Sequence, residues 1–464
     1  MVFAYDRKFP ALTGLLFFLP LFSLFAQRPV YSLSALVDSA QHYYPQLLQK
    51  QALLNGAEAN VTDARHLFLP SLKANEQISL GTDNSIPGSY LSYGIIPSTS
   101  SGVREANTAR SATGNIAILS AQYDLVDFGY RHAYIENAKS YVDLFEADRQ
   151  KEIYSLKIRA ARLYFGLLKD QFRLEVNKQN VARYENIFYI IRALTLSGLK
   201  PGSDSSLAKA ELSKSRIVFN QTAGRIEQFK EQLSFLTGLP VQDLQIDTSA
   251  KTYIRLQSQL KNQGPDDRSN PFLDYYEKQE NLFLSREKLT GKAYQPKIVL
   301  TANGWARGSA ISYNDQFNAL SQGLGYQRFN YLAGLSFQYD LFNGIHKHDK
   351  LRVSQFETKA SREALQQEQL VLHSAYLQAA SAIQTSETNL AELPVQLSSA
   401  TDVYNQELAQ YKAGIINLVD LTNAAFVLDR SQNDYIETLT DWYLAQLDKS
   451  WALGKLDNFI SSIK

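Results

Sequence analysis

The sequence predicts a mixed fold, in which strands suited to a membrane β-barrel continue into long all-α coiled-coil helices. Three observations predict it: the second half of the chain repeats the first, some segments alternate between apolar and polar residues, and the segments between them have helical periodicity. The repeat is clearest where Gln122-Tyr123-Asp124-Leu125 recurs as Gln338-Tyr339-Asp340-Leu341, at an offset of 216 residues.

Single residues outside this motif follow the repeat too. Gly198 matches Gly414 at the same offset, whereas Pro70 matches Pro296 at an offset of 226. The ten extra residues must therefore lie between Pro70 and Gln122, in one longer connection. A unit of this size is not a short solenoid repeat. We expect a fold that is built twice, with its function on the near-symmetry axis between the copies.

The N-terminus has the pattern of a secretory signal peptide. A basic pair, Arg7-Lys8, precedes an apolar run over residues 11–25, and Ala26-Gln27 is a suitable cleavage point. We therefore assign residues 1–26 to a cleaved signal. A retained transmembrane helix is the less favoured alternative, because the run is short and Pro20 interrupts it.

Composition excludes several classes of function. Without residues 1–26 the chain has 45 basic and 45 acidic side chains, and this neutrality argues against a nucleic-acid partner. The chain has no cysteine, which excludes disulfides and thiolate chemistry. It has 27 tyrosines, which suit surfaces that meet both apolar and wet surroundings. No second segment reaches about 18 uninterrupted apolar residues, the length of a helical span.

Four segments alternate like half-buried strands. Residues 331–341 are apolar at every odd position, and residues 117–125 keep the same parity. Residues 72–80 alternate in the same way, and residues 297–305 do so more weakly. Strands of about ten residues can cross a bilayer when they are tilted.

The segments between the strands are predicted to be helices. Apolar residues three and four apart predict coiled-coil packing in long helices between Gly129 and Gly198 and over residues 344–412. Shorter helices return over residues 204–236 and 418–453, and others precede the strands over 33–68 and 273–292. This gives a first repeat over residues 27–238, an inter-repeat segment over 239–270 and a second repeat over 271–464.

Four strands are too few to close a barrel, and an open sheet edge is not tolerated in lipid. The chain must therefore supply its missing edges by oligomerising. Two copies give eight strands and three copies give twelve, and both numbers can close.

At this point the chain resembles the TolC-like outer-membrane efflux protein family. The resemblance rests on the doubled strand-to-helix junctions, the tip segments Ser197-Gly198-Leu199 and Tyr411-Lys412-Ala413-Gly414, and the segment Val419-Asp420-Leu421-Thr422-Asn423-Ala424. It implies a homotrimer with a 12-stranded barrel in outer-membrane lipid and a helical tunnel across the periplasm of a Gram-negative bacterium. It also implies a periplasmic adaptor and an inner-membrane pump as partners, in efflux or type I secretion.

The resemblance also assigns a gate. It places Asp420 at the inner constriction, with Asn423 where relatives often have a second acid. Tyr411 and Asp204 match a closing pair, for which we expect a tyrosine–carboxylate hydrogen bond, and Ile416 stands at the basic position of relatives. The alternative for Asp420 and Asp204 is a helix-capping role, since both lie near a predicted helix start.

The remaining site residues are tip turns and a hinge. The resemblance assigns Gly198, Leu199, Lys412 and Gly414 to periplasmic tip turns that contact the adaptor. Pro394 has no counterpart in the first repeat, where Lys178 stands, so it predicts either a tolerated local kink or a hinge in the second hairpin.

The remaining motifs give little support to a catalytic or metal site. His346-Lys347-His348 puts two histidines on different helix faces without a third ligand nearby. The chain has no P-loop, HExxH, GxSxG or GxGxxG motif. We therefore expect no enzyme activity and no cofactor. The alternative to a channel is an exported coiled-coil scaffold or surface adhesin without a pore, which has no use for strands with a lipid-like face.

Overall fold

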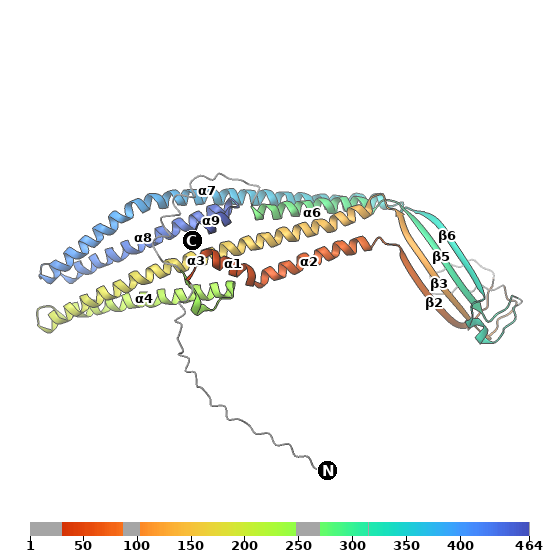
Figure 1. Ribbon diagram of the computed structural model, residues 1–464, viewed down its shortest axis with the longest axis horizontal. Coiled ribbons are helices and arrows are strands. Elements are labelled where there is room, and N and C mark those ends of the chain that lie inside the picture. The colour runs from red at the N-terminus through yellow and green to blue at the C-terminus, as the bar shows by residue number, and fades with distance from the viewer. Residues whose placement is uncertain (1–29, 87–102, 247–269, 314, 464) are drawn as a thin grey trace, which may run out of the picture.

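The computed structural model describes residues 30–86, 103–246, 270–313 and 315–463. Within them the molecule is long and narrow, with strands at one end and two helical hairpins at the other (Figure 1). The expected signal peptide and most of the inter-repeat segment lie outside the described residues. No helix in the described part of the chain is long and apolar enough to cross a membrane.

The first repeat contains the expected elements in the expected order, together with two short strands and a 3-10 turn that the sequence did not predict. They are β1 (Val30–Tyr31), α1 (Leu33–Tyr43), α2 (Pro45–His66), β2 (Ser71–Thr82), β3 (Ser111–Val126), α3 (Tyr130–Leu196), α4 (Gly202–Thr237), the 3-10 turn η1 (Val241–Asp243) and β4 (Gln245–Ile246).

The second repeat follows the same plan. Its elements are α6 (Pro271–Ala293), β5 (Lys297–Ser309), the 3-10 turn η3 (Leu320–Leu324), β6 (Arg328–Gln338), α7 (Asn343–Lys412), α8 (Leu418–Ala452) and α9 (Leu456–Ser462). The connection between β2 and β3 is ten residues longer than the one between β5 and β6, as the repeat offsets predict.

Several predicted boundaries are wrong, and the strand expected over 117–125 already begins at Ser111. The single helix expected over residues 33–68 is two helices, because Tyr44 is extended (φ −64°, ψ 115°) before Pro45, whose ring disfavours a helical residue in front of it. The strand expected over 331–341 ends at Gln338. Beyond it Asp340 turns the chain, since its Oδ1 accepts the backbone N–H of Phe342 at 2.9 Å.

The four long strands form one antiparallel sheet in the order β2-β3-β5-β6. Its register aligns the alternating patterns of all four strands. Leu119 lies opposite Ala74 on one side and Gly304 on the other, and Gly304 lies opposite Tyr331. Because directly opposed residues point to the same face, one face of the sheet is mostly apolar across all four strands, with Glu76 and Asn115 as polar residues on it.

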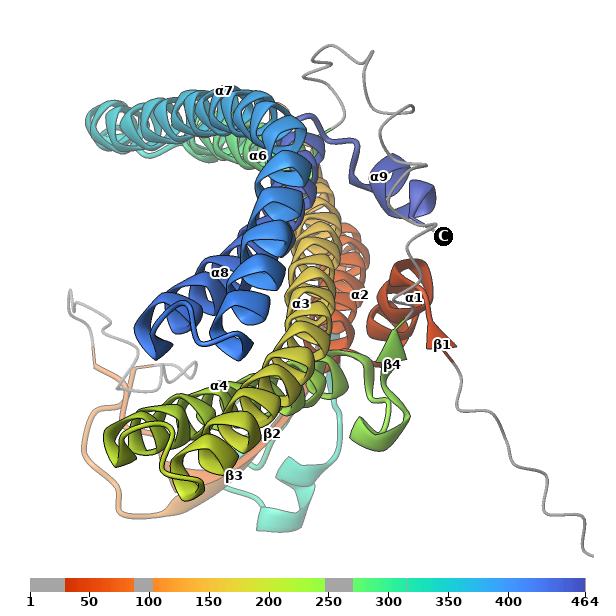
Figure 2. The ribbon, with the colours of Figure 1, turned by 90° about the vertical axis from the view of Figure 1, so that its left-hand side faces the viewer.

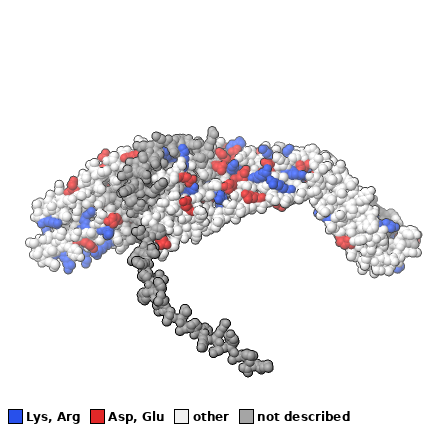
Figure 3. Space-filling view, viewed as in Figure 1, with Lys and Arg blue, Asp and Glu red and all other residues white. Residues whose placement is uncertain are grey.

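The helices lie side by side in the same order as the strands to which they are joined. α2 packs on α3, α3 on α6 and α6 on α7, which matches β2, β3, β5 and β6. Both layers are therefore open at two edges, formed by α2 with β2 and by α7 with β6. Figure 3 shows charged side chains gathered over the helices and few of them on the viewed side of the sheet.

The main core lies at the middle of the molecule, where the two repeats meet. Phe165 of α3 stacks on Tyr443 of α8 with ring centroids 5.3 Å apart, and Phe459 of α9 packs against the same ring of Phe165. Tyr154 closes this core by donating its hydroxyl to the Trp451 carbonyl at 2.9 Å. This equatorial core, which includes α1 and α4, fixes the base of both hairpins.

Candidate channel gate and hairpin tips

Both hairpins end in the same backbone turn. Gly198 and Gly414 adopt left-handed φ values of 76° and 77°, which glycine accepts without strain. The next amide in each turn, of Leu199 or Ile415, bonds back to a carbonyl five residues earlier, at 2.9 and 3.0 Å. Leu199 is 71% exposed and Ile415 is 73% exposed. Each tip therefore presents one aliphatic side chain at an equivalent position.

The two tips are joined by an apolar cluster from four helices. It contains Ile187 and Ile191 of α3, Leu212 of α4, Tyr411 of α7 and Leu421 of α8, all buried, with Ile416 packed against it. Figure 2 looks onto the tips and shows the α3–α4 and α7–α8 hairpins side by side, with α8 beside α3. Ile416 therefore contributes to the apolar contact between the two tips.

The expected hydrogen bond between Tyr411 and Asp204 is absent. Tyr411 is only 1% exposed, and its hydroxyl has no hydrogen-bond partner in the described structure. Burial raises the pKa of Tyr411, and the negative charge of the nearby Asp204 raises it further. The carboxylate therefore lies close enough to Tyr411 to act through its charge, but no hydrogen bond joins the two side chains.

A basic residue does reach Tyr411, from a place that the sequence reasoning missed. Lys200, two residues after Gly198, holds its Nζ 5.3 Å from the centre of the Tyr411 ring. Its position in a tip turn was visible in the sequence. Its proximity to the other tip was not, because only the packing of the two hairpins brings them together.

The capping alternative is wrong for both acids. The side chain of Asn417, not of Asp420, caps α8, since its Oδ1 accepts the Asp420 N–H at 3.0 Å. Pro201 precedes α4 without a side-chain cap, and Asp204 lies in the first turn. Asp420 and Asn423 are exposed near the second tip, as is Lys412 at the end of α7. Both acids are favourably placed for the helix dipole.

Pro394 lies inside α7, which continues unbroken from Asn343 to Lys412. Proline has no N–H, so one helical hydrogen bond is missing at this turn. Figure 1 shows that α7 is bent along the part that leads to its tip.

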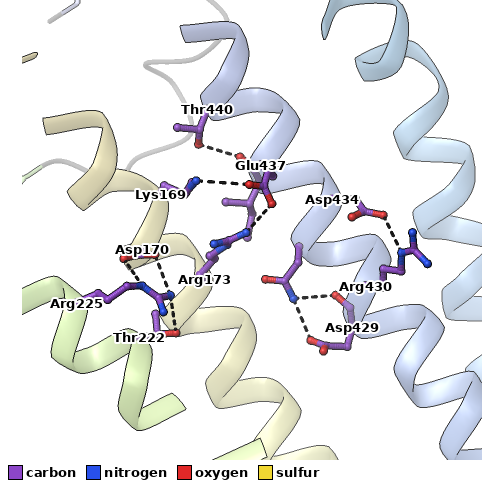
Figure 4. Close-up of polar contacts among 12 residues, drawn as sticks. Lys169, Asp170, Arg173, Thr222, Arg225, Asp429, Arg430, Asp434, Glu437 and Thr440 are labelled. Carbon is purple, nitrogen blue, oxygen red and sulfur yellow. Dashed lines mark hydrogen bonds and ion pairs between the residues drawn. The ribbon is translucent and has the colours of Figure 1, made fainter. Parts of the chain in front are cut away.

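The two hairpins also meet through charged side chains. Figure 4 shows Lys169 and Arg173 of α3 reaching Glu437 of α8, with N–O distances of 3.6 and 2.7 Å. On the opposite side of α3, Asp170 accepts two hydrogen bonds from Arg225 of α4, at 2.9 and 3.2 Å. α3 is therefore bonded to its own hairpin partner on one side and to the second hairpin on the other.

This architecture agrees with the comparisons with known proteins. The family model of outer membrane efflux proteins matches residues 36–239 and 269–454. The chain belongs to the outer membrane efflux protein family. The structure has the TolC-like fold of the family, in which a helical part is joined to a small β domain. Membership of this family places the protein in the outer membrane. A search of curated protein sequences finds no match.

Solved structures of outer-membrane channels share the fold. The outer membrane protein VceC of Vibrio cholerae is 15% identical with a TM-score of 0.73, covering 91% of this chain and 96% of its own. The CmeC outer membrane channel of Campylobacter jejuni is 13% identical with a TM-score of 0.72, covering 93% and 90%. The MtrE outer membrane channel of Neisseria gonorrhoeae, solved in an open state, is 16% identical with a TM-score of 0.66, covering 91% and 89%. The family and these structures support an efflux channel and give no support to the scaffold or adhesin alternative.

Proposed function

We propose that three copies of this chain form an outer-membrane efflux channel whose helices make a tunnel across the periplasm of a Gram-negative bacterium. One observation carries the proposal: the sheet is mostly apolar on one face, and its open edges β2 and β6 continue into the open edges α2 and α7 in the same order. A single chain leaves all four edges unpaired. Copies joined edge to edge close the strand layer and the helical layer together.

The exposed surfaces at these edges support that assembly. A groove on α2 and α3 is lined by small and aromatic side chains, among them Gly56, Ala59 and Phe145. At the opposite edge α7 exposes Val353 and Phe356. Apolar surface of this kind is normally covered in an oligomer. Joining the edges of neighbouring copies covers it, and the strand number of twelve follows from three copies.

The hairpins support a gate at the inner end of the tunnel. Asp420 and Asn423 are exposed on the second hairpin, where three copies form a ring of carboxylates that attracts cations. Tyr411 keeps the second tip near the first through its packing in the tip cluster, and Asp204 lies close to it on the first hairpin. Pro394 supplies the hinge about which the second hairpin moves, because α7 lacks one hydrogen bond there.

The tips are the docking surface for a periplasmic adaptor that links the channel to an inner-membrane pump. Gly198 and Gly414 shape the two turns, and Leu199 and Lys412 are exposed there. The energy for transport is supplied by the pump, in efflux or in type I secretion.

The test is to extract the full chain from outer membranes in detergent, count its subunits by cross-linking and record conductance in planar bilayers. We expect trimers and discrete ion-conducting pores. Recovery as a monomer that needs no detergent, or a trimer that conducts no ions, contradicts the proposal.

A further inference from the structure

The contact between the two hairpins changes character along its length. It is apolar at the equator, where Phe165 stacks on Tyr443, and apolar again in the tip cluster. Between these two apolar zones α3 and α8 meet through polar side chains, in a stretch that contains Asn180 and Asp429. Movement of the second hairpin away from the first must therefore break this polar stretch.

Asp429 of α8 is the carboxylate at the centre of the stretch. Its Oδ1 accepts a hydrogen bond from the side-chain amide of Asn180 on α3, which is only 4% exposed. The same Oδ1 accepts the side-chain amide of Asn433, one turn further along α8, at 3.1 Å. A proton on Oδ2 leaves both amide bonds in place.

The side-chain amide of Asn180, which bridges the two helices, also contacts a cation. Arg183 of α3 donates to Oδ1 of Asn180 and, at 3.4 Å, to Gln432 of α8. Its guanidinium also lies 5.1 Å from the ring centre of Tyr404 on α7. Asn180 therefore separates the cation from the carboxylate, and the two charges have no direct ion pair to compensate their burial.

The surroundings set the proton affinity of Asp429. Burial raises its pKa, and this effect exceeds the opposing effects of Arg183, the two amides and Lys214 of α4. Tyr184 of α3, Glu211 of α4 and Tyr404 of α7 lie in the same region, where Tyr184 interacts electrostatically with the other two. Further along α8, burial also raises the pKa of Asp441, against Lys169 and Arg173.

We propose that Asp429 is a proton-binding latch between the hairpins: the second hairpin packs against the first when Asp429 is protonated and separates more readily when Asp429 is ionised. This inference rests on the proposed gating movement of the second hairpin. It adds a control of the gate by periplasmic pH. The controlling residue, Asp429, lies several helical turns away from the tip turn.

The direction follows from linkage. In the packed arrangement the pKa of Asp429 is raised, whereas a carboxylate that the movement exposes to water returns to the ordinary value of about 4. The packed arrangement thus binds the proton more tightly, and acid favours it. The stabilisation is complete below the ordinary pKa and is lost as the pH rises through the raised pKa.

Single-channel recording on the full-length protein tests the latch. As the pH falls from about 7.5 towards the ordinary carboxyl value of about 4, we expect the open-to-closed ratio of the wild type to fall. Asp429→Asn, which carries the shape of the protonated side chain without its charge, should have the low ratio throughout this range.

Asp434→Asn is the matched control. Asp434 lies on the same helix and loses the same charge, but its partners are Arg430 and Gln396 of the second hairpin. It should respond to pH like the wild type. Arg183→Gln removes a cation that lowers the pKa of Asp429, so its response should move to higher pH, which a merely structural role of Arg183 does not produce.

The outcomes separate the two proposals. A chain that forms no pores contradicts the proposed function itself. Pores whose pH response is the same in Asp429→Asn as in the wild type, or pores that open on acidification, overturn the latch and leave the channel intact.

Discussion

The two hairpins share a topology but are held together differently. Across α3 and α4, Asp170 bonds to Arg225, Glu185 pairs with Arg216 at 2.5 Å, and Phe229 packs over Gly166. Across α7 and α8 the structure has no ion pair among its described residues; the polar contacts are Gln396 with Asp434 at 3.4 Å and Glu387 with Trp442 at 3.3 Å.

The side chains between α7 and α8 are also of a different kind. A groove between the two helices is lined by small and polar residues, including Ala382, Thr385, Ser386 and Asn389. These helices still lie close together along their length, so the hairpins differ in their polar contacts and not in the extent of their packing. Pro394 removes a backbone bond nearby. Duplication therefore produced two hairpins of one shape, of which the first is the stiffer and the second the more compliant.

The largest expected effect is in the first hairpin. Asp170→Ala removes a carboxylate that is 2% exposed together with its two hydrogen bonds from Arg225, which should destabilise α3 and α4 by about 2 kcal/mol, since Arg225 itself is partly exposed and stays hydrated. Hydrogen exchange of the hairpin amides measures this local stability. Asp434→Ala in the second hairpin should change it by less than about 1 kcal/mol. Equal effects at the two sites contradict the stiffness difference.

A second change tests the packing of the first hairpin without altering charge. A Cβ at Gly166 comes within 2.6 Å of the Phe229 ring, so Gly166→Val should lower stability by about 2 kcal/mol through overpacking. Thermal unfolding of the trimer in detergent is the measurement. Gly224→Ala on α4, where a Cβ meets nothing within 4 Å, should instead be neutral or slightly stabilising.

Restoring the missing backbone bond should make the second hairpin more like the first. Pro394→Ala should raise the exchange protection of α7 by about 1 kcal/mol and lower the open probability of the channel. Lys178→Ala at the matching position of α3 serves as the control, since no backbone bond changes there. Unchanged protection in Pro394→Ala leaves the proline as a tolerated kink without a hinge role.

The smallest effect is expected at the tip. The Tyr411 hydroxyl is buried without a hydrogen-bond partner, so Tyr411→Phe should stabilise the tip cluster slightly, by less than about 1 kcal/mol. Its conductance should match the wild type or fall below it. A clear rise in conductance would show that the hydroxyl holds the gate closed through a bond formed in the assembly.

Much of the fold could be predicted because its signals are local. The alternation of apolar and polar residues over 331–337, and over the strands that pair with it, predicts the strands. Apolar residues that recur three and four apart over long segments predict the helices. The errors lie at boundaries, where one residue decides: Tyr44 before Pro45 breaks a helix, and Asp340 ends β6 early. The contacts of the candidate gate were harder to predict from the sequence. Lys200 and Tyr411, for example, are 211 residues apart in sequence and meet only when the tips pack.

The sequence by itself determined the duplication, the order of the elements and the turns at Gly198 and Gly414, because periodicity and glycine geometry depend on neighbours along the chain. The tertiary structure decided which faces meet. It placed Asn180 against Asp429, left Tyr411 without a hydrogen-bond partner, and bonded the first hairpin more tightly than the second. These features depend on distances between helices, which no local pattern encodes.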